Sequence, residues 1–445
     1  MLNEKKSKRG TVIALLCALA LLALVILLEN TMKPTGMLFT VLKKGAVYAL
    51  VAVSMNLLNG FTGLFSLGQA GFMLIGAYAF SIFSIPAEQH ASVYQYFDGG
   101  AIQFSIPEML GNVFGANAGN FLGAIICIVI AGLVAAVFAA LIGIPVLRLK
   151  SDYLAIATLG FAEIIRAIFQ WNGLGKITNG SNLLRKYTNF HDIKIQIGGT
   201  IFQLDTIFPF LIATLSIVII VLLVNSSYGR AFKSIRDDEV AAEAMGINLF
   251  KHKMLSFCIS SFFAGVGGAL FAMFVNNAQA KVYTSTMTYE ILLIVVIGGI
   301  GSISGSCLAT FLYVACAEWW LRFLDSPMTF TSVTDTRRIL FILVFAALVI
   351  GGALLLIRRE RRTTKKVWKE LLVSLAALAL LVWLAFFIIS GSLTVPLLRT
   401  GFRMVVFSVI IMIVVLFFRR GIMGDKEFSD ILFARRNASG KGAVK

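Results

Sequence analysis

Long apolar runs separated by short polar segments extend along most of the chain and predict a bundle of membrane helices. A helix needs about 20 predominantly apolar residues to cross a bilayer. Segments that meet or approach this length lie at about 11–28, 37–58, 63–85, 119–147, 153–171, 207–224, 254–275, 286–300, 303–323, 338–357, 371–390 and 401–418. The segments 286–300 and 303–323 are short and meet near Gly301, so two complete crossings and a re-entrant pair fit them equally well. The predicted fold class is an all-α polytopic membrane protein with about 10–12 transmembrane helices, including broken or re-entrant segments.

The distribution of basic residues predicts the orientation of these spans. A basic run precedes the first apolar segment and no small-residue cleavage site follows it, so this segment is expected to remain as a span. With the N-terminus inside and the spans alternating, 25 of the 39 Lys and Arg residues fall in the cytoplasmic segments 1–10, 148–152, 225–253, 358–369 and 419–445. The external segments hold ten. This asymmetry follows the positive-inside rule, so both termini are predicted to be cytoplasmic.

Composition supports a membrane protein and argues against a nucleic-acid-binding one. The 445 residues are 58% hydrophobic and 14% charged, with a mean hydropathy of +0.89, which a soluble domain could not bury. The net charge of +17 comes from basic residues clustered between apolar runs, where they are expected to face anionic lipid and not nucleic acid. All five cysteines lie in apolar segments without metal-ligand spacing and are expected to be inert.

One segment outside the apolar runs has the pattern of a β-hairpin. Residues 193–204 alternate apolar and polar side chains on both sides of Gly198-Gly199. Such alternation around a pair of glycines is typical of two antiparallel strands. We therefore expect a small hairpin on the external side of the membrane.

No catalytic signature is present, so the chain is not expected to be an enzyme. Gly175-Lys176 is followed by Ile177, where a phosphate-binding loop would carry Ser or Thr for magnesium. The three histidines lie in loops and form no metal-binding pattern. We expect no cofactor and no metal site in this chain.

The polar segment 230–253 predicts a short amphipathic helix outside the bilayer. Ser234 is expected to cap a helix over 234–247, and Gly246 is expected to end it. The acidic residues of the expected first turn, where the helix dipole favours negative charge, are Asp237, Asp238 and Glu239. A narrow apolar stripe consists of Val240, Ala241, Ala244 and Met245. A helix of this length is marginal alone, so it is expected to dock on a partner, although an ordinary connecting loop is an alternative.

Polar and small residues inside the apolar runs mark candidate positions along a translocation path. Hydrocarbon penalises polar groups, so these side chains should face protein or a water-filled route. Within 56–78 the candidates are Asn56, Ser66 and Gln69 among closely spaced glycines. For most of these glycines, close helix packing is the expected role.

Two further segments supply the remaining candidates. In 149–166 these are Thr158, Glu163 and Arg166; the last two can form an ion pair, which either faces the path or pins the helix against its neighbours. In 298–305 the candidates are Gly298, Gly301, Ser302 and Ser304. The spacing Gly-x-x-Gly-x-x-Ser occurs both here and at Gly60, Gly63 and Ser66, which is weak evidence for an internal repeat with broken helices.

These blocks resemble the permease subunit of high-affinity branched-chain amino acid ABC importers, the leucine/isoleucine/valine type. The resemblance is carried by SLGQAGF, DYLAIATLGFAEIIR, AAEAMGIN and GGIGSISG, in this order. It extends from about residue 45 to 320 and resumes at Arg403 in a closing span and tail. Residues 325–400 depart from the pattern and are expected to be an inserted pair of helices within a single permease domain over 1–445.

The resemblance implies a function and a set of partners. It implies a multi-pass subunit in the bacterial cell membrane that imports branched-chain amino acids by alternating access. The implied partners are a second related permease, two cytoplasmic ATPases that bind the ATP and magnesium, and an extracytoplasmic solute-binding protein. The segment 234–247 would be the ATPase-coupling helix. Three alternatives stay open at this point: a urea or short-chain amide importer of the same family, an ATP-independent carrier or channel, and a membrane scaffold with no transport role.

Overall fold

A computed structural model describes residues 36–149, 151–197, 200–321 and 421–424. The chain divides into two compact units, Met1–Trp320 with Val409–Lys445 and Leu321–Ser408, and the architecture below is that of the first. The expected spans at 11–28, 338–357, 371–390 and 401–418, and the expected insertion at 325–400, lie outside the described residues.

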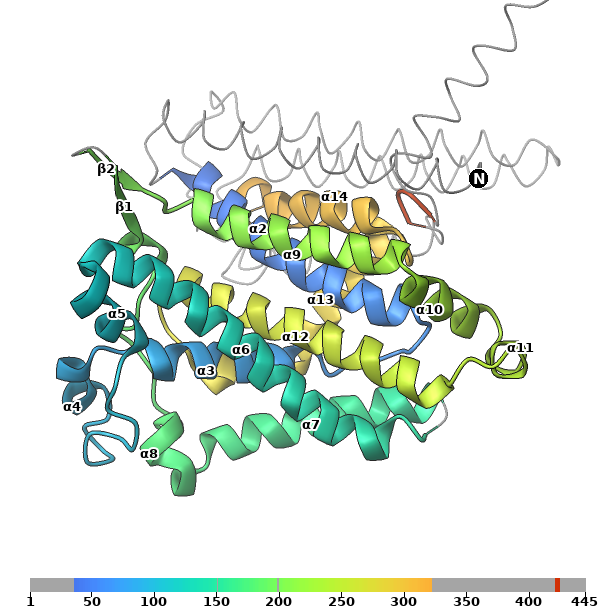
Figure 1. The fold of residues 1–445 in the computed structure, drawn as a ribbon, viewed down its shortest axis with the longest axis horizontal. Helices are drawn as coiled ribbons and strands as arrows, with labels where there is room; N and C mark the ends of the chain where they lie inside the picture. The colour runs from blue at the N-terminus through green and yellow to red at the C-terminus, as the bar shows by residue number, and fades with distance from the viewer. Residues whose placement is uncertain (1–35, 150, 198–199, 322–420, 425–445) are drawn as a thin grey trace, which may run out of the picture. The chain divides into compact units, whose positions relative to one another are not determined.

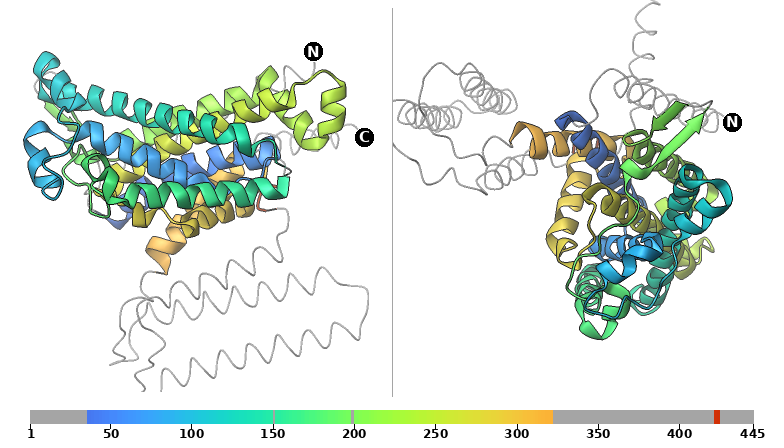
Figure 2. Two further views of the ribbon diagram at one scale, coloured as in Figure 1. Left: turned by 90° about the horizontal axis from the view of Figure 1, so that it is seen from below. Right: turned by 90° about the vertical axis from the view of Figure 1, so that its left-hand side faces the viewer.

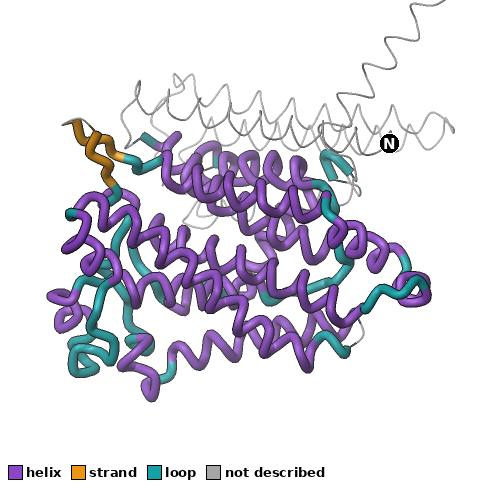
Figure 3. The backbone as a smooth tube through the Cα atoms, viewed as in Figure 1, coloured by secondary structure: helices purple, strands orange, loops and turns teal. Residues whose placement is uncertain are grey.

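The described part of the chain is helical except for one pair of strands (Figures 1 and 3). The α-helices are α2 (Met37–Asn56), α3 (Gln69–Ser84), α4 (His90–Val93), α5 (Ile106–Phe114), α6 (Ala116–Val146), α7 (Ser151–Gln170), α8 (Gly175–Thr178), α9 (Ile207–Asn225), α10 (Ser227–Asp237), α11 (Glu239–Ala244), α12 (Leu249–Val275), α13 (Ser285–Gly298) and α14 (Ile303–Val314). Wider π-helical turns extend α2 over Leu57–Phe61 and α14 over Ala315–Trp320. Short 3₁₀ turns occur at Ala87–Gln89, Asn172–Leu174, Phe190–Asp192 and Ala280–Val282.

The apolar helices confirm the prediction of a polytopic membrane protein. Among the described residues, five helices are long and apolar enough to cross a bilayer, and they span Met37–Phe61, Ala116–Val146, Tyr153–Gln170, Ile207–Asn225 and Leu249–Val275. The expected span at 63–85 is shorter than predicted, because α3 begins only at Gln69 and is followed by a bend of 103° into Ala87–Val93. Helix α13 has 14 residues, whereas α14 has 12 and continues through its π-helical turn to Trp320, so the pair around Gly301 consists of one short helix and one longer helix.

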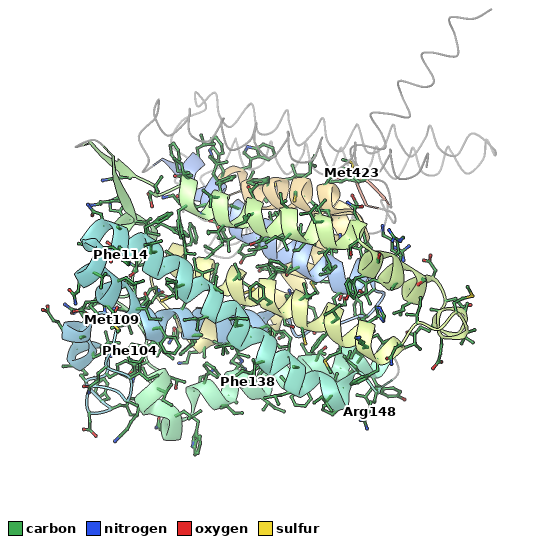
Figure 4. The ribbon with its side chains drawn as sticks, in the orientation of Figure 1. Phe104, Met109, Phe114, Phe138, Arg148 and Met423 are labelled. Atoms are coloured by element: carbon green, nitrogen blue, oxygen red, sulfur yellow. The ribbon has the colours of Figure 1, made fainter. Side chains whose placement is uncertain are left out.

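The connecting segments gather at two opposite ends of this bundle. Helices α10 and α11 lie at one end, and α4 and α5 lie at the other, in both the view of Figure 1 and the left view of Figure 2. Figure 4 shows the same separation along α6, where Phe114 precedes the helix at one end and Arg148 follows it at the other. We refer to these as the α10–α11 end and the hairpin end.

Helix α12 forms the centre of the bundle because its glycines allow three neighbours to approach its backbone. A Cβ at Gly265 would lie 2.6 Å from the Cβ of Ala135 and 2.9 Å from the carbonyl oxygen of Ala131, both on α6. A Cβ at Gly76 of α3 would overlap the backbone of Gly265 itself. In a bilayer, where helices gain no hydrophobic energy by leaving lipid, such close van der Waals packing is a main source of association.

The hairpin expected at 193–204 is present. Strands β1 (Lys194–Ile197) and β2 (Thr200–Gln203) pair antiparallel, with Lys194 opposite Gln203 and Ile197 opposite Thr200. Strand β1 lies against α6, and the buried Ile193 precedes it. An isolated two-stranded hairpin is marginally stable, so this packing supports it.

The crossing at Gly265 generates a stability prediction. We expect Gly265→Leu to lower the melting temperature and the yield of folded protein, because its side chain has no space between α12 and α6. Gly160→Leu is the matched control, since Gly160 on α7 is exposed and has no neighbour within 4 Å. Thermal unfolding of the purified, detergent-solubilised chain measures both; equal melting temperatures would contradict the central role of α12.

Candidate coupling and translocation site

The polar segment after α9 folds into two helices separated by a sharp break. Helix α10 continues to Asp237, and Asp238 then adopts an extended backbone with φ −160° and ψ 111°. The Asp238 carboxylate accepts hydrogen bonds from the amides of Val240 and Ala241, at 2.9 and 3.1 Å, and so caps α11. The prediction that Ser234 caps a single helix over 234–247 is therefore wrong. Ser234 lies inside α10, where its hydroxyl donates to the carbonyl of Ala231.

Helix α11 presents an apolar surface that no described residue covers. The side chain of Val240 is 78% exposed and that of Met245 is 83% exposed, and both alanines of the expected stripe are exposed as well. Only Ala242 turns inward and is buried. Gly246 follows with φ +84°, a left-handed conformation that ends the segment as predicted and that side chains with a Cβ rarely adopt. We call Val240, Ala241, Ala244 and Met245 the α11 stripe.

Arg236 connects this pair of helices to the turn between α2 and α3. Its Nη1 donates to the carbonyl oxygen of Gly60 at 3.1 Å, while Nε and Nη2 donate to the Asp237 carboxylate at 3.1 and 3.0 Å. The same guanidinium lies beside Gly301, where a Cβ would be 3.3 Å from Nη1. The carboxylate therefore orients an arginine that contacts both glycine-rich turns.

The two glycine-rich turns, which share the spacing Gly-x-x-Gly-x-x-Ser, touch each other. A Cβ at Gly60 would lie 2.5 Å from the amide nitrogen of Gly301. Asn56, which is fully buried, accepts a hydrogen bond from that amide at 2.8 Å. Its Nδ2 donates to the Ser302 carbonyl and the Ser306 hydroxyl, both at 2.9 Å. All the hydrogen-bonding groups of this side chain thus hold α2 against the start of α14.

A row of buried hydroxyl and amide groups continues from these turns into the bundle. We call this row the polar seam; its side chains are Ser54, Thr62, Gln69, Thr158, Ser256, Ser260 and Thr288. Gln69 donates to Ser54 at 2.7 Å, and the hydroxyls of Thr62 and Ser256 are 2.6 Å apart.

The seam also receives the backbone where α3 begins. The amide of Leu67 donates to the Thr158 hydroxyl at 3.0 Å, and that of Ala70 to Thr288 at 3.1 Å. The buried Ser66 lies in the same non-helical stretch, with its amide bonded to Asn59 at 3.2 Å. Side chains from α7 and α13 therefore satisfy amides that lack helical partners where α3 begins.

Glu163 and Arg166 form the expected ion pair on α7, away from the polar seam. The Glu163 carboxylate accepts from Arg166 Nε at 2.7 Å and lies 2.5 Å from Nη2. The two side chains remain 37% and 31% exposed, next to the exposed Ile164. Of the path candidates in this helix, only Thr158 joins the seam.

The second glycine-rich turn also binds a segment from far along the chain. The amides of Ile422 and Met423 donate to the carbonyls of Ile297 and Gly298, at 2.7 and 3.2 Å. These carbonyls belong to the last turn of α13, which has no further helical amides to accept from. Figure 4 places Met423 in this position beside the bundle. The 421–424 turn therefore caps α13 next to Gly298 and Gly299.

Several residues of the site were not predicted. Arg236 stood in the polar segment, but nothing in its spacing indicated a contact with Gly60. The hydroxyls of Thr62, Ser256, Ser260 and Thr288 were also missed. Their position inside apolar runs is a usable signal, because buried Ser and Thr in a membrane helix usually hydrogen-bond within the bundle.

Buried polar turns, broken helices and an uncovered helix outside the apolar bundle together define a polytopic membrane protein. A family model described as the permease component of the branched-chain amino acid transport system matches residues 37–351. The chain therefore belongs to this family of transport permeases. The match extends past residue 320, where the resemblance was expected to stop.

Individual relatives agree with the family. The chain is similar to the high-affinity branched-chain amino acid transport system permease protein LivM of Escherichia coli K12, at 31% identity over 304 residues and 63% of each chain. The Salmonella typhimurium protein of the same name is 30% identical over 304 residues, which is 63% of this chain and 63% of its own. A probable LivM of Methanocaldococcus jannaschii is 25% identical over 60% of this chain and 76% of its own. The match thus spans less than two thirds of the two bacterial relatives, and no solved structure matches the chain.

The buried Asn56 generates a prediction for the contact between the two turns. Asn56→Leu removes the acceptor of the Gly301 amide, and a buried amide without a partner costs about 1–3 kcal/mol. We therefore expect a clear fall in melting temperature, measured by thermal unfolding of the purified chain. Asn225→Leu, at the exposed end of α9, is the matched control and should be nearly neutral. An Asn56→Leu protein as stable as this control would contradict the role given to Asn56.

Proposed function

We propose that the chain is the membrane-spanning subunit of an ATP-driven importer that carries branched-chain amino acids by alternating access, and that α10 and α11 couple it to ATP hydrolysis. Family membership supports the transport role, and the names of the relatives support the substrate class. The observation that carries the coupling role is the exposed α11 stripe. It leaves two large apolar side chains, Val240 and Met245, uncovered outside the apolar bundle.

The contacts of α10 supply a route from this surface to the interior. A partner that moves α11 also moves Arg236, since only Asp238 separates the two helices. Arg236 in turn is bonded to Gly60, and Gly60 lies against Gly301. In the proposed mechanism, displacement of the α11 stripe shifts the two glycine-rich turns relative to each other.

The path candidates are proposed to act near these turns. Asn56, Ser66, Gln69 and Thr158 lie in or beside the polar seam, and Gly298, Gly301, Ser302 and Ser304 form the turn that Asn56 holds. A solute that crosses here would exchange hydrogen bonds with these groups. The half-buried Glu163–Arg166 pair is not part of this proposal, because it lies away from the polar seam.

The proposed assembly follows from the family. It contains a second related permease, two ATPases that bind the α11 surface and hold ATP and magnesium, and an extracytoplasmic solute-binding protein. The α10–α11 end would then face the cytoplasm with both chain termini, and the hairpin end would face the outside of the cell. No cofactor or metal is proposed for this chain.

Charge placed on the α11 stripe should uncouple ATP hydrolysis from uptake. We expect Ala244→Asp and Met245→Asp to reduce leucine uptake at least about tenfold, because burying an unpaired carboxylate in an apolar contact is strongly unfavourable. Uptake is measured in cells that express the complete transporter, and ATPase activity is measured on the purified complex. Gly246→Val should act similarly, since valine resists the φ of +84° found there.

Ser227→Asp is the control for these variants. It introduces the same charge at an exposed position of the first turn of α10, where a helix favours acids, and it leaves the α11 stripe intact. Normal uptake by both Ala244→Asp and Met245→Asp at normal expression would refute the coupling role.

The hairpin at 193–204 is proposed to help receive the solute-binding protein. Replacing 194–203 with a glycine linker should leave the helices inserted and the basal ATPase activity unchanged. It should abolish the stimulation of ATPase activity by the loaded solute-binding protein. Full stimulation in this variant would rule out the docking role, and labelling of Lys194 from the cytoplasm would overturn the orientation.

A further inference from the structure

Four buried aromatic side chains lie together near the hairpin end of the bundle. They are Tyr48 of α2, Tyr78 of α3, Phe271 of α12 and Tyr283, which precedes α13, and we call them the aromatic layer. Each is at most 7% exposed. The ring centroids of Tyr48 and Phe271 are 6.0 Å apart and those of Phe271 and Tyr283 are 5.9 Å apart, both in edge-to-face contact. Such contacts favour close packing, so these rings fill the space between the helices that carry them.

The aromatic layer lies on the hairpin side of the polar seam. Helix α2 begins at the hairpin end, and α3 and α12 end there (Figure 1). On each of these helices the layer residue is nearer that end than the seam residue; the pairs are Tyr48 and Ser54, Tyr78 and Gln69, and Phe271 and Ser260. At a rise of about 1.5 Å per residue, the members of these pairs are roughly 9, 13 and 16 Å apart along the helix axes. A solute that enters between these helices from the hairpin end therefore meets the layer before it reaches the seam.

Tyr78 and Tyr283 are held in different ways. The Tyr78 hydroxyl accepts a hydrogen bond from the Ala280 amide at 3.0 Å, and its ring packs against Phe169 of α7 with the centroids 5.0 Å apart. The Tyr283 hydroxyl is buried and has no hydrogen-bond partner among the described residues. A buried hydroxyl without a partner is unfavourable, so the observed position of Tyr283 has a free-energy cost that the position of Tyr78 does not have.

Tyr283 also differs from the other layer residues because it is not part of a helix of the bundle. It lies in the connection 276–284 between α12 and α13. This connection is attached to the segment between α7 and α9, which carries the hairpin, because the backbones of Ala278 and Leu184 exchange two hydrogen bonds at 3.0 Å. A displacement of that segment would therefore move the connection, and Tyr283 with it, while the helices stay packed.

These observations distinguish Tyr283 from the three rings around it. We propose that Tyr283 is the movable barrier of the path at the hairpin end. Its ring closes the aromatic layer in this structure and turns aside with the 276–284 connection when a solute is admitted. Thr288 of the seam follows only five residues later, in the first turn of α13, so the ring lies next to the start of the seam on this helix. The inference rests on the proposed function for the path and for the side of the membrane from which the solute arrives.

Labelling of a cysteine in the seam tests this barrier. Thr288→Cys is introduced into the full-length chain after the native cysteines other than Cys127 have been replaced by serine. Intact cells that contain the complete membrane complex, but no solute-binding protein, are depleted of ATP and treated with a membrane-impermeant methanethiosulfonate reagent. Mass spectrometry then gives the rate of labelling at each cysteine. Cys127 is fully buried in α6, so its reaction would report unfolding.

Tyr283→Ala should raise the labelling rate at Thr288→Cys at least about tenfold, because the reagent no longer waits for a ring to turn aside and a small fall in a barrier multiplies a rate. Tyr289→Ala is the matched control and should leave the rate unchanged, since Tyr289 is 47% exposed on α13 and lies outside the layer. Tyr283→Phe keeps the ring and should leave the layer closed. Equal rates in Tyr283→Ala and Tyr289→Ala would overturn the proposal, and so would labelling of Tyr283→Phe as fast as that of Tyr283→Ala.

Phe271→Ala is a second variant for the case that Tyr283→Ala does not fold, which the reaction of Cys127 would reveal. Phe271 contacts both Tyr48 and Tyr283, so its removal should also raise the labelling rate at least about tenfold. An unchanged rate in a folded Phe271→Ala protein would contradict a barrier formed by this layer.

A cysteine outside the layer separates this inference from the proposed function. Lys186 is exposed at the hairpin end, where its ammonium is bonded to Gln89 and Ser92, so Lys186→Cys should be labelled in intact cells. Labelling there, together with slow labelling of Thr288→Cys in every variant, would remove the barrier and leave the transport role standing. No labelling of Lys186→Cys would instead overturn the orientation in the proposed function and, with it, the side of the membrane assigned to Tyr283.

Discussion

The hydrogen bonds of Asn56 to the turn at Gly301 are the interaction on which the rest of the described structure depends. They join α2 to the start of α14 through a side chain that is fully buried and has no group left over. The contact needs glycine at both positions, because a Cβ at Gly60 would lie 2.5 Å from the amide nitrogen of Gly301, and Gly301 adopts φ +90°. In a membrane interior an unpaired amide has no water to bond with, and the asparagine therefore fixes the geometry of both turns.

Two further sets of contacts hold the glycine-rich turns at the α10–α11 end of the bundle. Arg236 binds the Gly60 carbonyl and lies beside Gly301, while the 421–424 turn binds the carbonyls just before Gly299. Arg236 of α10 thus holds the first glycine-rich turn, and the 421–424 turn holds the end of α13 beside the second one. These bonds go to backbone atoms and not to side chains, so in the proposed mechanism a movement of α10 would act directly on the main chain at the turns.

Much of this arrangement was predictable from the sequence, and the limits have physical causes. The described spans, the hairpin and the exposed stripe follow from apolar length, strand alternation and helical spacing, which are local patterns. The cap of α11 was misplaced because Ser234 and Asp238 are both good capping residues, and only the break after Asp237 decides between them. The late start of α3 at Gln69 depends on Thr158 and Thr288, which accept from amides far away in the sequence. Single-sequence patterns contain no signal for such long-range bonds.

If the polar seam is the path proposed above, polar groups and not apolar side chains close it. Its groups bond to one another or to nearby backbone atoms, so the bundle leaves few of these polar atoms unpaired. An intramolecular hydrogen bond contributes only about 0.5–1.5 kcal/mol net, because its alternative is a bond to water or to another partner. Under the proposed function, Gln69 would therefore exchange its hydrogen bond to Ser54 for one to a polar solute at small cost once the backbone around it moves. A seam of leucines would close as tightly, but it would give an entering zwitterion no partner to replace its water. Under the proposed function, the larger energy of ATP hydrolysis would act on the glycine-rich turns and not on the seam.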